Sequence, residues 1–195
     1  MQRHLKFRWI AVLGLMLAGT SIPTVLWAEP PLRAVFIARH GEKATAPQEN
    51  PPLSPAGQAR AQALLETLRD VGLTAVITTQ QQRTRETGAP LLTGLHLQPM
   101  IVPTSPDPYE HARAVATTVR QAGGTVLIID HQLTIPLIVA ALGGPSVATM
   151  CDIEFSNLYI LVPAGSTRIA LLRTHYGTPD PPRAEGCRIT PVSPP

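Results

Sequence analysis

The segment Ala34-Val35-Phe36-Ile37-Ala38-Arg39-His40-Gly41-Glu42 is an apolar run that stops abruptly at a polar triplet. The apolar part is typical of a buried β-strand. A lone histidine after a strand is more often structural than catalytic. Here, however, Arg39 supplies a fixed cation and Gly41 a backbone that can approach a ligand closely. The segment therefore predicts a strand whose carboxyl end carries chemistry.

Two further strands are expected to end in polar side chains. Residues 125–129 are apolar on both faces, as in a buried parallel sheet, and lead into Asp130 and His131. Residues 75–78 form another short apolar run, and the chain then continues toward Arg83. Ligands of α/β sheets gather at the carboxyl ends of the strands. We therefore expect the three strand ends to meet at one site.

The remaining chain alternates between strand and helix patterns. A helix is predicted from Ser54-Pro55 to Gly72, since serine caps helices and proline suits their first position. Further helices are expected at 80–92, interrupted near 88–90, at 109–121 and at 135–142. Further strands are expected around 100–102, 158–162 and 169–173. This alternation predicts an α/β fold, a three-layer α/β/α sandwich around a mostly parallel central sheet.

The first 28 residues have the composition of a secretory signal peptide. Three basic residues precede an apolar run that is well short of the ~20 residues a membrane-spanning helix needs. An uncleaved membrane anchor is the main alternative, and a buried N-terminal helix is a further one. We expect a signal peptide at 1–28, a catalytic domain at 29–178 and a Pro-rich C-terminal tail at 179–195. The expected location is periplasmic or secreted, with no stable membrane insertion after cleavage.

Charge and cysteine content narrow the function further. Removal of residues 1–28 takes away three of the 16 basic residues and none of the 13 acidic ones, leaving 13 of each. This balance gives no support for nucleic-acid binding. In an oxidising compartment Cys151 and Cys187 could form a disulfide, although two separate thiols are an equally open alternative. No four-ligand Cys/His spacing typical of a metal site is present.

Several motifs follow one another in an order that resembles the histidine phosphatase superfamily, which has the phosphoglycerate-mutase-like fold. The chain is similar to small exported bacterial members over residues 34–177. The elements that carry the resemblance are Arg39-His40-Gly41-Glu42, Leu53-Ser54-x-x-Gly57, Thr78-Thr79-x-x-x-Arg83-Thr84-x-x-Thr87, His131-x-x-Thr134-Ile135-Pro136, Leu142-Gly143-Gly144 and Tyr176-Gly177.

The resemblance implies a phosphomonoester hydrolase that acts through a phosphohistidine on His40, with neither metal nor cofactor. Arg39, Arg83 and a protonated His131 would hold the phosphate oxygens, and Gly41 would let the backbone close around the nucleophile. The expected substrate is a small phosphomonoester or a phosphorylated envelope component. An alternative is a phosphate- or phosphosugar-binding module on the same fold that turns over poorly.

The acid that protonates the leaving group is open at this point. Glu110 and Asp107 are candidates, although acids at a helix start are common for local reasons. Asp130 departs from the Gly or Ser that small relatives commonly carry before the second histidine. It could raise the pKa of His131, repel the phosphate or serve as the acid itself.

Other polar residues receive simpler interpretations. Glu42 could orient a ligand or pair with Lys43, and Thr84 could support the site indirectly. The remaining candidates are expected to be surface or packing residues, namely Arg85, His96, His111 and His175.

Overall fold

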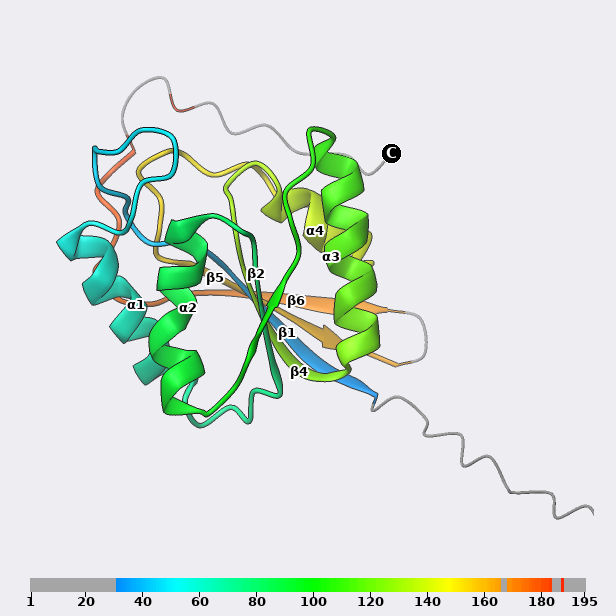
Figure 1. Cartoon of the computed structure of the whole chain (residues 1–195). Coiled ribbons are helices and arrows are strands. Elements are labelled where there is room, and N and C mark those ends of the chain that lie inside the picture. The colour runs from blue at the N-terminus through cyan, green and yellow to red at the C-terminus, as the bar shows by residue number, and fades with distance from the viewer. Residues whose placement is uncertain (1–30, 166–167, 184–186, 188–195) are drawn as a thin grey trace, which may run out of the picture.

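The computed structural model describes residues 31–165, 168–183 and 187, so the expected signal peptide lies outside the described residues. Strands and helices alternate over most of this part of the chain (Figure 1). The order is β1 (Leu32–Arg39), α1 (Pro55–Leu68), β2 (Ala75–Thr78), α2 (Gln82–Gly94), β3 (Pro99–Ile101), α3 (Pro108–Ala122), β4 (Gly124–Asp130), α4 (Ile135–Ala141), β5 (Asn157–Pro163) and β6 (Ile169–His175). None of the helices in these ranges is long and apolar enough to cross a membrane.

The six strands form one mixed sheet in the order β3-β2-β4-β1-β5-β6. β3, β2, β4 and β1 are parallel to one another, whereas β5 is antiparallel to both β1 and β6. The α/β class is confirmed, but "mostly parallel" describes only the part of the sheet from β3 to β1. β4 is buried along its whole length, as its two apolar faces predict.

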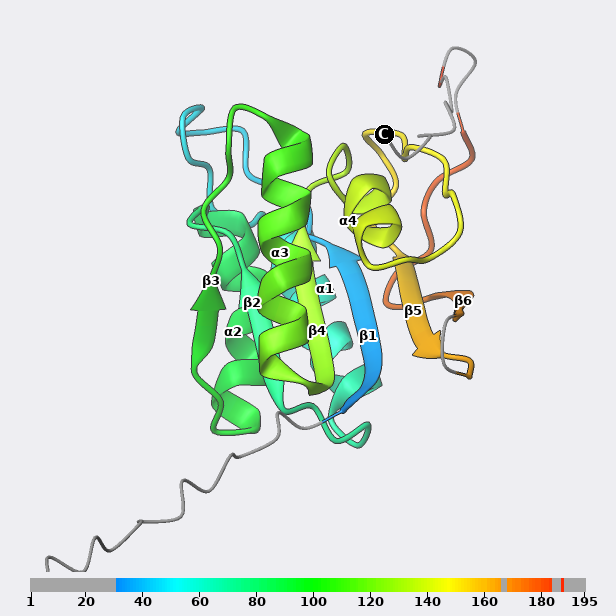
Figure 2. The same cartoon turned by 90° about the vertical axis from the view of Figure 1, so that its right-hand side faces the viewer.

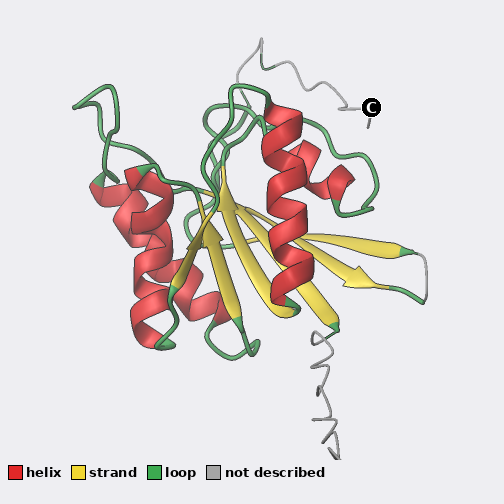
Figure 3. Ribbon diagram, turned by 45° about the vertical axis from the view of Figure 1, so that its right-hand side comes forward, coloured by secondary structure: helices red, strands yellow, loops and turns green. Residues whose placement is uncertain are grey.

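Helices cover both faces of the sheet, which gives the expected three layers (Figure 3). Alternate residues of the central strands belong to two separate cores. Val35 and Ile37 pack in the core that includes residues of α3 and α4. Phe36 and Ala38 pack in the core that includes residues of α1 and α2. Because side chains alternate along a strand, a shift of one residue in register would place each set in the wrong core.

The helix expected to be interrupted near 88–90 is continuous, because α2 runs through Pro90 to Gly94. A proline inside a helix removes one backbone hydrogen bond. Close packing of α2 against the sheet offsets the free-energy cost of this missing hydrogen bond. A Cβ on Gly88 would lie 3.1 Å from the Cδ1 of Ile129, so the helix rests directly on β4 at this point.

The direction of β5 follows from the connection that precedes it. In Figure 2 the arrowheads of β1 and β4 point up and that of β5 points down. After the short helix α4, the chain passes through the 151–156 turn and enters the sheet beside the carboxyl end of β1, where Leu158 pairs with Ala38. No helix returns the chain to the opposite edge. The next strand must therefore run antiparallel, and the 151–156 turn stays at the functional edge.

A disulfide joins Cys151 to Cys187, with a Cα–Cα distance of 5.8 Å. Of the two alternatives left open by the sequence, the structure has the bridge. It connects the turn before β5 with the segment after β6, 36 residues further along the chain.

Replacement of both cysteines by serine is expected to lower the free energy of unfolding by about 3 kcal/mol, because the cross-link restricts the unfolded chain. Guanidinium chloride unfolding with and without reductant measures this. Reductant should lower the midpoint of the wild type and leave that of the double variant unchanged. An unchanged wild-type midpoint would contradict the bridge.

Candidate active site

Strand register brings His40 and His131 together. β1 and β4 pair in parallel with Arg39 opposite Asp130, so the two residues that follow are neighbours. The backbone N–H of His40 donates to the Asp130 carbonyl at 3.0 Å. The centroids of the two imidazole rings are 5.3 Å apart, in an edge-on arrangement. The predicted meeting of these strand ends is therefore present.

The hydrogen bonds of His40 define its tautomer. Nδ1 lies 2.8 Å from the Gly41 carbonyl oxygen, which can only accept, so Nδ1 carries the proton. Nε2 is then unprotonated, and its lone pair accepts from the Nε–H of Arg83 at 3.2 Å. Burial, with the nearby charges of His131, Arg39 and Arg83, lowers the pKa of His40 to about 3. At neutral pH, His40 is therefore an uncharged imidazole with Nε2 as its nucleophilic atom.

Arg83 bridges the two histidines from the first turn of α2. Besides its bond to His40, its Nη2 lies 3.4 Å from Nδ1 of His131, and its Nη1 donates to the Gln81 side chain at 3.3 Å. Burial lowers the pKa of Arg83. Arg85, two residues along the same helix, is exposed. The structure thus separates the two arginines as the family register predicts.

His131 is held on its other side by a pair of threonines. Since Nδ1 faces an Arg83 donor, Nε2 carries the proton and donates to the Thr79 hydroxyl at 3.2 Å. That hydroxyl lies 2.9 Å from the Thr84 hydroxyl. Burial lowers the pKa of His131 to about 4, although the charge of Asp130 raises it. Among these protein groups His131 is therefore uncharged at neutral pH, in contrast to the cation that the resemblance implies, and a nearby anion would favour its protonated form.

Arg39 is buried and its guanidinium is firmly held. Its Nη1 donates to the carbonyl oxygens of Cys151, Asp152 and Glu154, each at 3.0 Å, and its Cζ lies 4.1 Å from the ring centroid of Phe155. Burial lowers its pKa to about 10, which leaves it charged at neutral pH. The buried Nε has no hydrogen-bond partner among the described residues. Such a donor is costly to leave unpaired and suits an anionic ligand.

Gly41 and Glu42 have structural partners. The N–H of Gly41 donates to the Thr87 hydroxyl at 2.9 Å, and a Cβ on Gly41 would lie 2.9 Å from the Gly57 carbonyl oxygen. The glycine therefore permits close contact with the first turn of α1. Glu42 pairs with the buried Arg60, at 2.7 Å, and not with Lys43.

Asp130 and His111 form a buried pair between β4 and α3. Asp130 Oδ2 lies 2.9 Å from His111 Nε2, and Oδ1 accepts from the His131 N–H at 2.8 Å and the Thr134 hydroxyl at 2.5 Å. His111 Nδ1 lies 3.0 Å from the Pro103 carbonyl. Burial opposes protonation of His111, but these two acceptors together raise its pKa. Asp130 thus holds the His131 backbone and is neutralised by His111, which was expected to be only a surface or packing residue.

The two candidate acids are exposed at the start of α3. Glu110 accepts from the Ser105 hydroxyl at 2.6 Å, and Asp107 caps the helix by accepting from the Tyr109 N–H at 2.8 Å. The 104–105 segment is tied to the residue after Thr79, because the Thr104 N–H donates to the Gln80 side chain at 2.9 Å. Asp107 is thus the N-cap of α3 and Glu110 lies in its first turn, and their hydrogen bonds go to neighbouring residues and not to His40 or His131.

Together these groups form a compact cluster of two arginines and two histidines around Nε2 of His40. Arg39 and Arg83 carry charge, and the N-terminus of α2 adds a favourable field for an anion. Forked guanidinium donors suit the oxygens of a phosphate. Among the described residues, no three His, Cys, Asp or Glu side chains are grouped so that they could hold a metal ion. The arrangement suits a tetrahedral oxyanion next to His40 Nε2.

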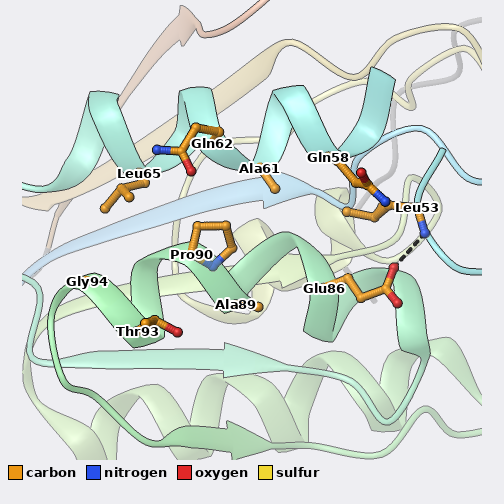
Figure 4. A pocket seen from close by; sticks show the side chains of 10 residues that line it. All are labelled: Leu53, Gln58, Ala61, Gln62, Leu65, Glu86, Ala89, Pro90, Thr93 and Gly94. Carbon is orange, nitrogen blue, oxygen red and sulfur yellow. Dashed lines mark hydrogen bonds between the residues drawn. The ribbon is translucent and has the colours of Figure 1, made fainter. Parts of the chain in front are cut away.

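A separate pocket of about 610 Å³ lies between α1 and α2 (Figure 4). Glu86 is its one charged lining residue, and its carboxylate accepts from the Leu53 N–H at 2.6 Å. Neither histidine nor arginine lines it. A pocket with an acid and no cation does not suit a phosphate, so the candidate site is the one around His40. The lining residues are Leu53, Gln58, Ala61, Gln62, Leu65, Glu86, Ala89, Pro90, Thr93 and Gly94.

Comparisons with known proteins agree with this architecture. The family model described as histidine phosphatase superfamily (branch 1) matches residues 35–104. A mycobacterial glucosyl-3-phosphoglycerate phosphatase superposes with a TM-score of 0.55 at 15% identity, covering 71% of this chain and 96% of its own. The protein histidine phosphatase SixA, in a complex with tungstate, gives 0.52 at 18% identity, covering 73% and 96%. YhfR of Bacillus stearothermophilus gives 0.54 at 19% identity, covering 71% and 94%. No curated protein matches the chain.

The fold and the candidate site define an α/β protein with two histidines and two arginines at the carboxyl edge of a mixed sheet. The match of the family model and the shared fold confirm the resemblance to the histidine phosphatase superfamily.

Arg83→Ala is expected to weaken phosphate or tungstate binding roughly ten- to hundredfold, because a charge-assisted hydrogen bond contributes about 1.5–3 kcal/mol. Isothermal titration calorimetry measures the change. Arg85→Ala is the matched control, since it removes an exposed arginine of the same helix and should change the affinity less than about twofold. Equal effects of both variants would contradict the assigned pocket.

His111→Ala is expected to destabilise the fold by about 3–5 kcal/mol, because it leaves the buried Asp130 carboxylate without its partner. The folded-state pKa of His111 is raised, so its contribution is complete below the unfolded value of 6.5 and is lost as pH rises through the folded value. Urea unfolding of both proteins across a pH series measures the difference. A difference that grows with pH would contradict the ion pair.

Proposed function

We propose that this protein is a phosphomonoester hydrolase that acts through a phosphohistidine on His40. The observation that carries the proposal is the Nε2 lone pair of a neutral imidazole held 3.2 Å from the guanidinium of Arg83. A phosphate bound by Arg83 would place its phosphorus next to this lone pair. Proximity of this kind lowers the barrier to transfer.

The first chemical step forms the Nε2–phosphorus bond of His40 and breaks the bond from phosphorus to the ester oxygen. The electron pair of the broken bond goes to the leaving alcohol, which takes up a proton. Positive charge develops on the imidazole, and the Nδ1–H bond to the Gly41 carbonyl stabilises it. Arg39 and Arg83 stabilise the negative charge on the nonbridging oxygens.

In the second step, water attacks the phosphorus of the phosphohistidine. The nitrogen–phosphorus bond breaks, its electron pair returns to Nε2 and inorganic phosphate leaves. His131 would bind the same oxygens, and an anion beside it would raise its low pKa toward the protonated form. Glu110 or Asp107 stays the predicted acid of the first step. Asp130 is less suited, because hydrogen bonds occupy both of its carboxylate oxygens.

We further propose that the protein is exported to the periplasm or the cell exterior, where it hydrolyses small phosphomonoesters or phosphorylated envelope components. The basic and apolar composition of residues 1–28 supports export. The bridge between Cys151 and Cys187 agrees with an oxidising compartment. Secretion of a fused reporter enzyme by residues 1–28, and its loss on their deletion, tests the location.

Wild-type protein is expected to release phosphate from an activated aryl phosphate in the presence of EDTA, and His40→Ala should lower this rate by at least about a thousandfold. The good leaving group reduces the need for an acid, so the assay tests the nucleophile directly. Alkaline quenching with labelled substrate should trap an acid-labile phosphoenzyme in the wild type alone.

Two outcomes would contradict the proposal in different ways. Undiminished activity of His40→Ala would show that the nucleophile is wrong. Binding of tungstate by a wild type that releases no phosphate would favour the phosphate-binding module, for which the lack of a hydrogen bond from Glu110 or Asp107 to His40 is the supporting observation.

A further inference from the structure

The turn at residues 151–156 packs against Arg39 and His40 at the candidate site. Three of its carbonyl oxygens converge on a single nitrogen, Nη1 of Arg39. Its Phe155 ring stacks on the same guanidinium and lies 6.2 Å from the imidazole of His40, between centroids. The position of the turn therefore determines where Arg39 can direct its remaining N–H groups.

The turn itself depends on the segment that follows β6. Oδ1 of Asp180 accepts from the N–H groups of Phe155 at 2.8 Å and Ser156 at 3.0 Å, and Oδ2 accepts from the Ser156 hydroxyl at 2.7 Å. The N–H of Tyr176 donates to the Ser156 carbonyl at 2.9 Å. One carboxylate thus satisfies three donors of the turn.

A second set of contacts holds the first half of the turn. Glu154 is buried, and its Oε2 accepts from the Cys151 N–H at 2.7 Å. Its Oε1 accepts from Nε and Nη2 of Arg183, at 2.8 and 2.7 Å. The disulfide then ties Cys151 to Cys187. In Figures 1 and 2, the segment after β6 lies beside the connection that enters β5, in agreement with these contacts.

These contacts matter because the 151–156 turn contains neither helix nor strand. Backbone carbonyls repel one another, and three of them converge on one nitrogen only if the backbone is held from outside. Asp180, Arg183 and Cys187 supply that restraint. A guanidinium with one nitrogen fixed in this way loses little further freedom when a ligand binds to the rest of it.

We propose that the segment 176–183, with Cys187, positions the phosphate pocket, and that Asp180 and Arg183 are positioning residues for Arg39 and His40. The proposal rests on the phosphatase function proposed above. It assigns a role in catalysis to a tail that the sequence presents only as Pro-rich. Neither Asp180 nor Arg183 touches the reacting atoms, since both act through the 151–156 turn.

Asp180→Ala is expected to lower kcat/KM for an aryl phosphate by at least about tenfold, because a small misplacement of a catalytic group has large effects on rate. Asp180→Asn keeps an oxygen for the two backbone N–H groups and should stay within about threefold of the wild type. Asp70→Ala removes an acid that is 93% exposed and serves as the matched control. All variants are made in the full chain with the disulfide intact.

The inhibition constant of orthovanadate distinguishes a displaced Arg39 from a smaller fraction of folded protein. A partly unfolded population lowers the apparent kcat but leaves the inhibition constant of the folded molecules unchanged. A displaced Arg39 weakens vanadate binding, so Asp180→Ala should raise the inhibition constant about as much as it lowers kcat/KM. An unchanged inhibition constant would overturn the proposal.

Arg183→Ala gives a second test that is less sensitive to folding, since this side chain is 46% exposed. It should raise the vanadate inhibition constant more than threefold, whereas Arg69→Ala, at 55% exposure, should not. An active wild type with unaffected Asp180→Ala and Arg183→Ala variants would disprove the positioning role alone. A wild type without phosphatase activity would instead disprove the function on which this role rests.

Discussion

β1 and β4 pair in parallel with Arg39 opposite Asp130, and the amide of His40 extends this ladder by donating to the Asp130 carbonyl. On one face of both strands lies the layer of α1 and α2, and on the other face lies the layer of α3 and α4. A shift of one residue would therefore move both apolar sets into the wrong cores as well as separating the two histidines. The register that places the apolar side chains in their cores is also the register that places His40 beside His131. The packing that stabilises the sheet therefore also maintains the distance between these two histidines.

That distance creates an electrostatic difficulty, because four groups that can carry positive charge lie side by side. Burial resolves it in favour of the arginines. The pKa of His40 falls to about 3 and that of His131 to about 4, while Arg39 at about 10 stays charged. Arg83 donates a hydrogen bond to each imidazole. A neutral ring has an unprotonated nitrogen that can accept this bond, whereas a protonated ring has none. The burial that keeps His40 uncharged thus also leaves its Nε2 unprotonated, and the two remaining charges favour an anion.

The residues of this site that could be predicted from the sequence are those that directly follow a strand. An apolar run followed by a polar triplet is visible in the sequence, and parallel strands bring such ends together. The Asp130–His111 pair was missed because its members lie 19 residues apart on different elements. A signal was nevertheless present. An acid at the end of a fully apolar strand needs a buried partner, and His111 is spaced four residues before Val115, on the apolar face of α3. Each residue, taken alone, suggested a different and weaker role.

The 151–156 turn could not be predicted in this way, because its place depends on the direction of β5. A parallel β5 would have needed a return crossing to the opposite edge, and the residues before it would then lie far from Arg39. The family model matches residues 35–104, which include β1 and Arg83 but end before β4. His40 and both arginines thus lie within the matched part, whereas His131 and the turn that holds Arg39 come from later residues. The position of Arg39 therefore depends on contacts that lie outside the part of the chain matched by the family model.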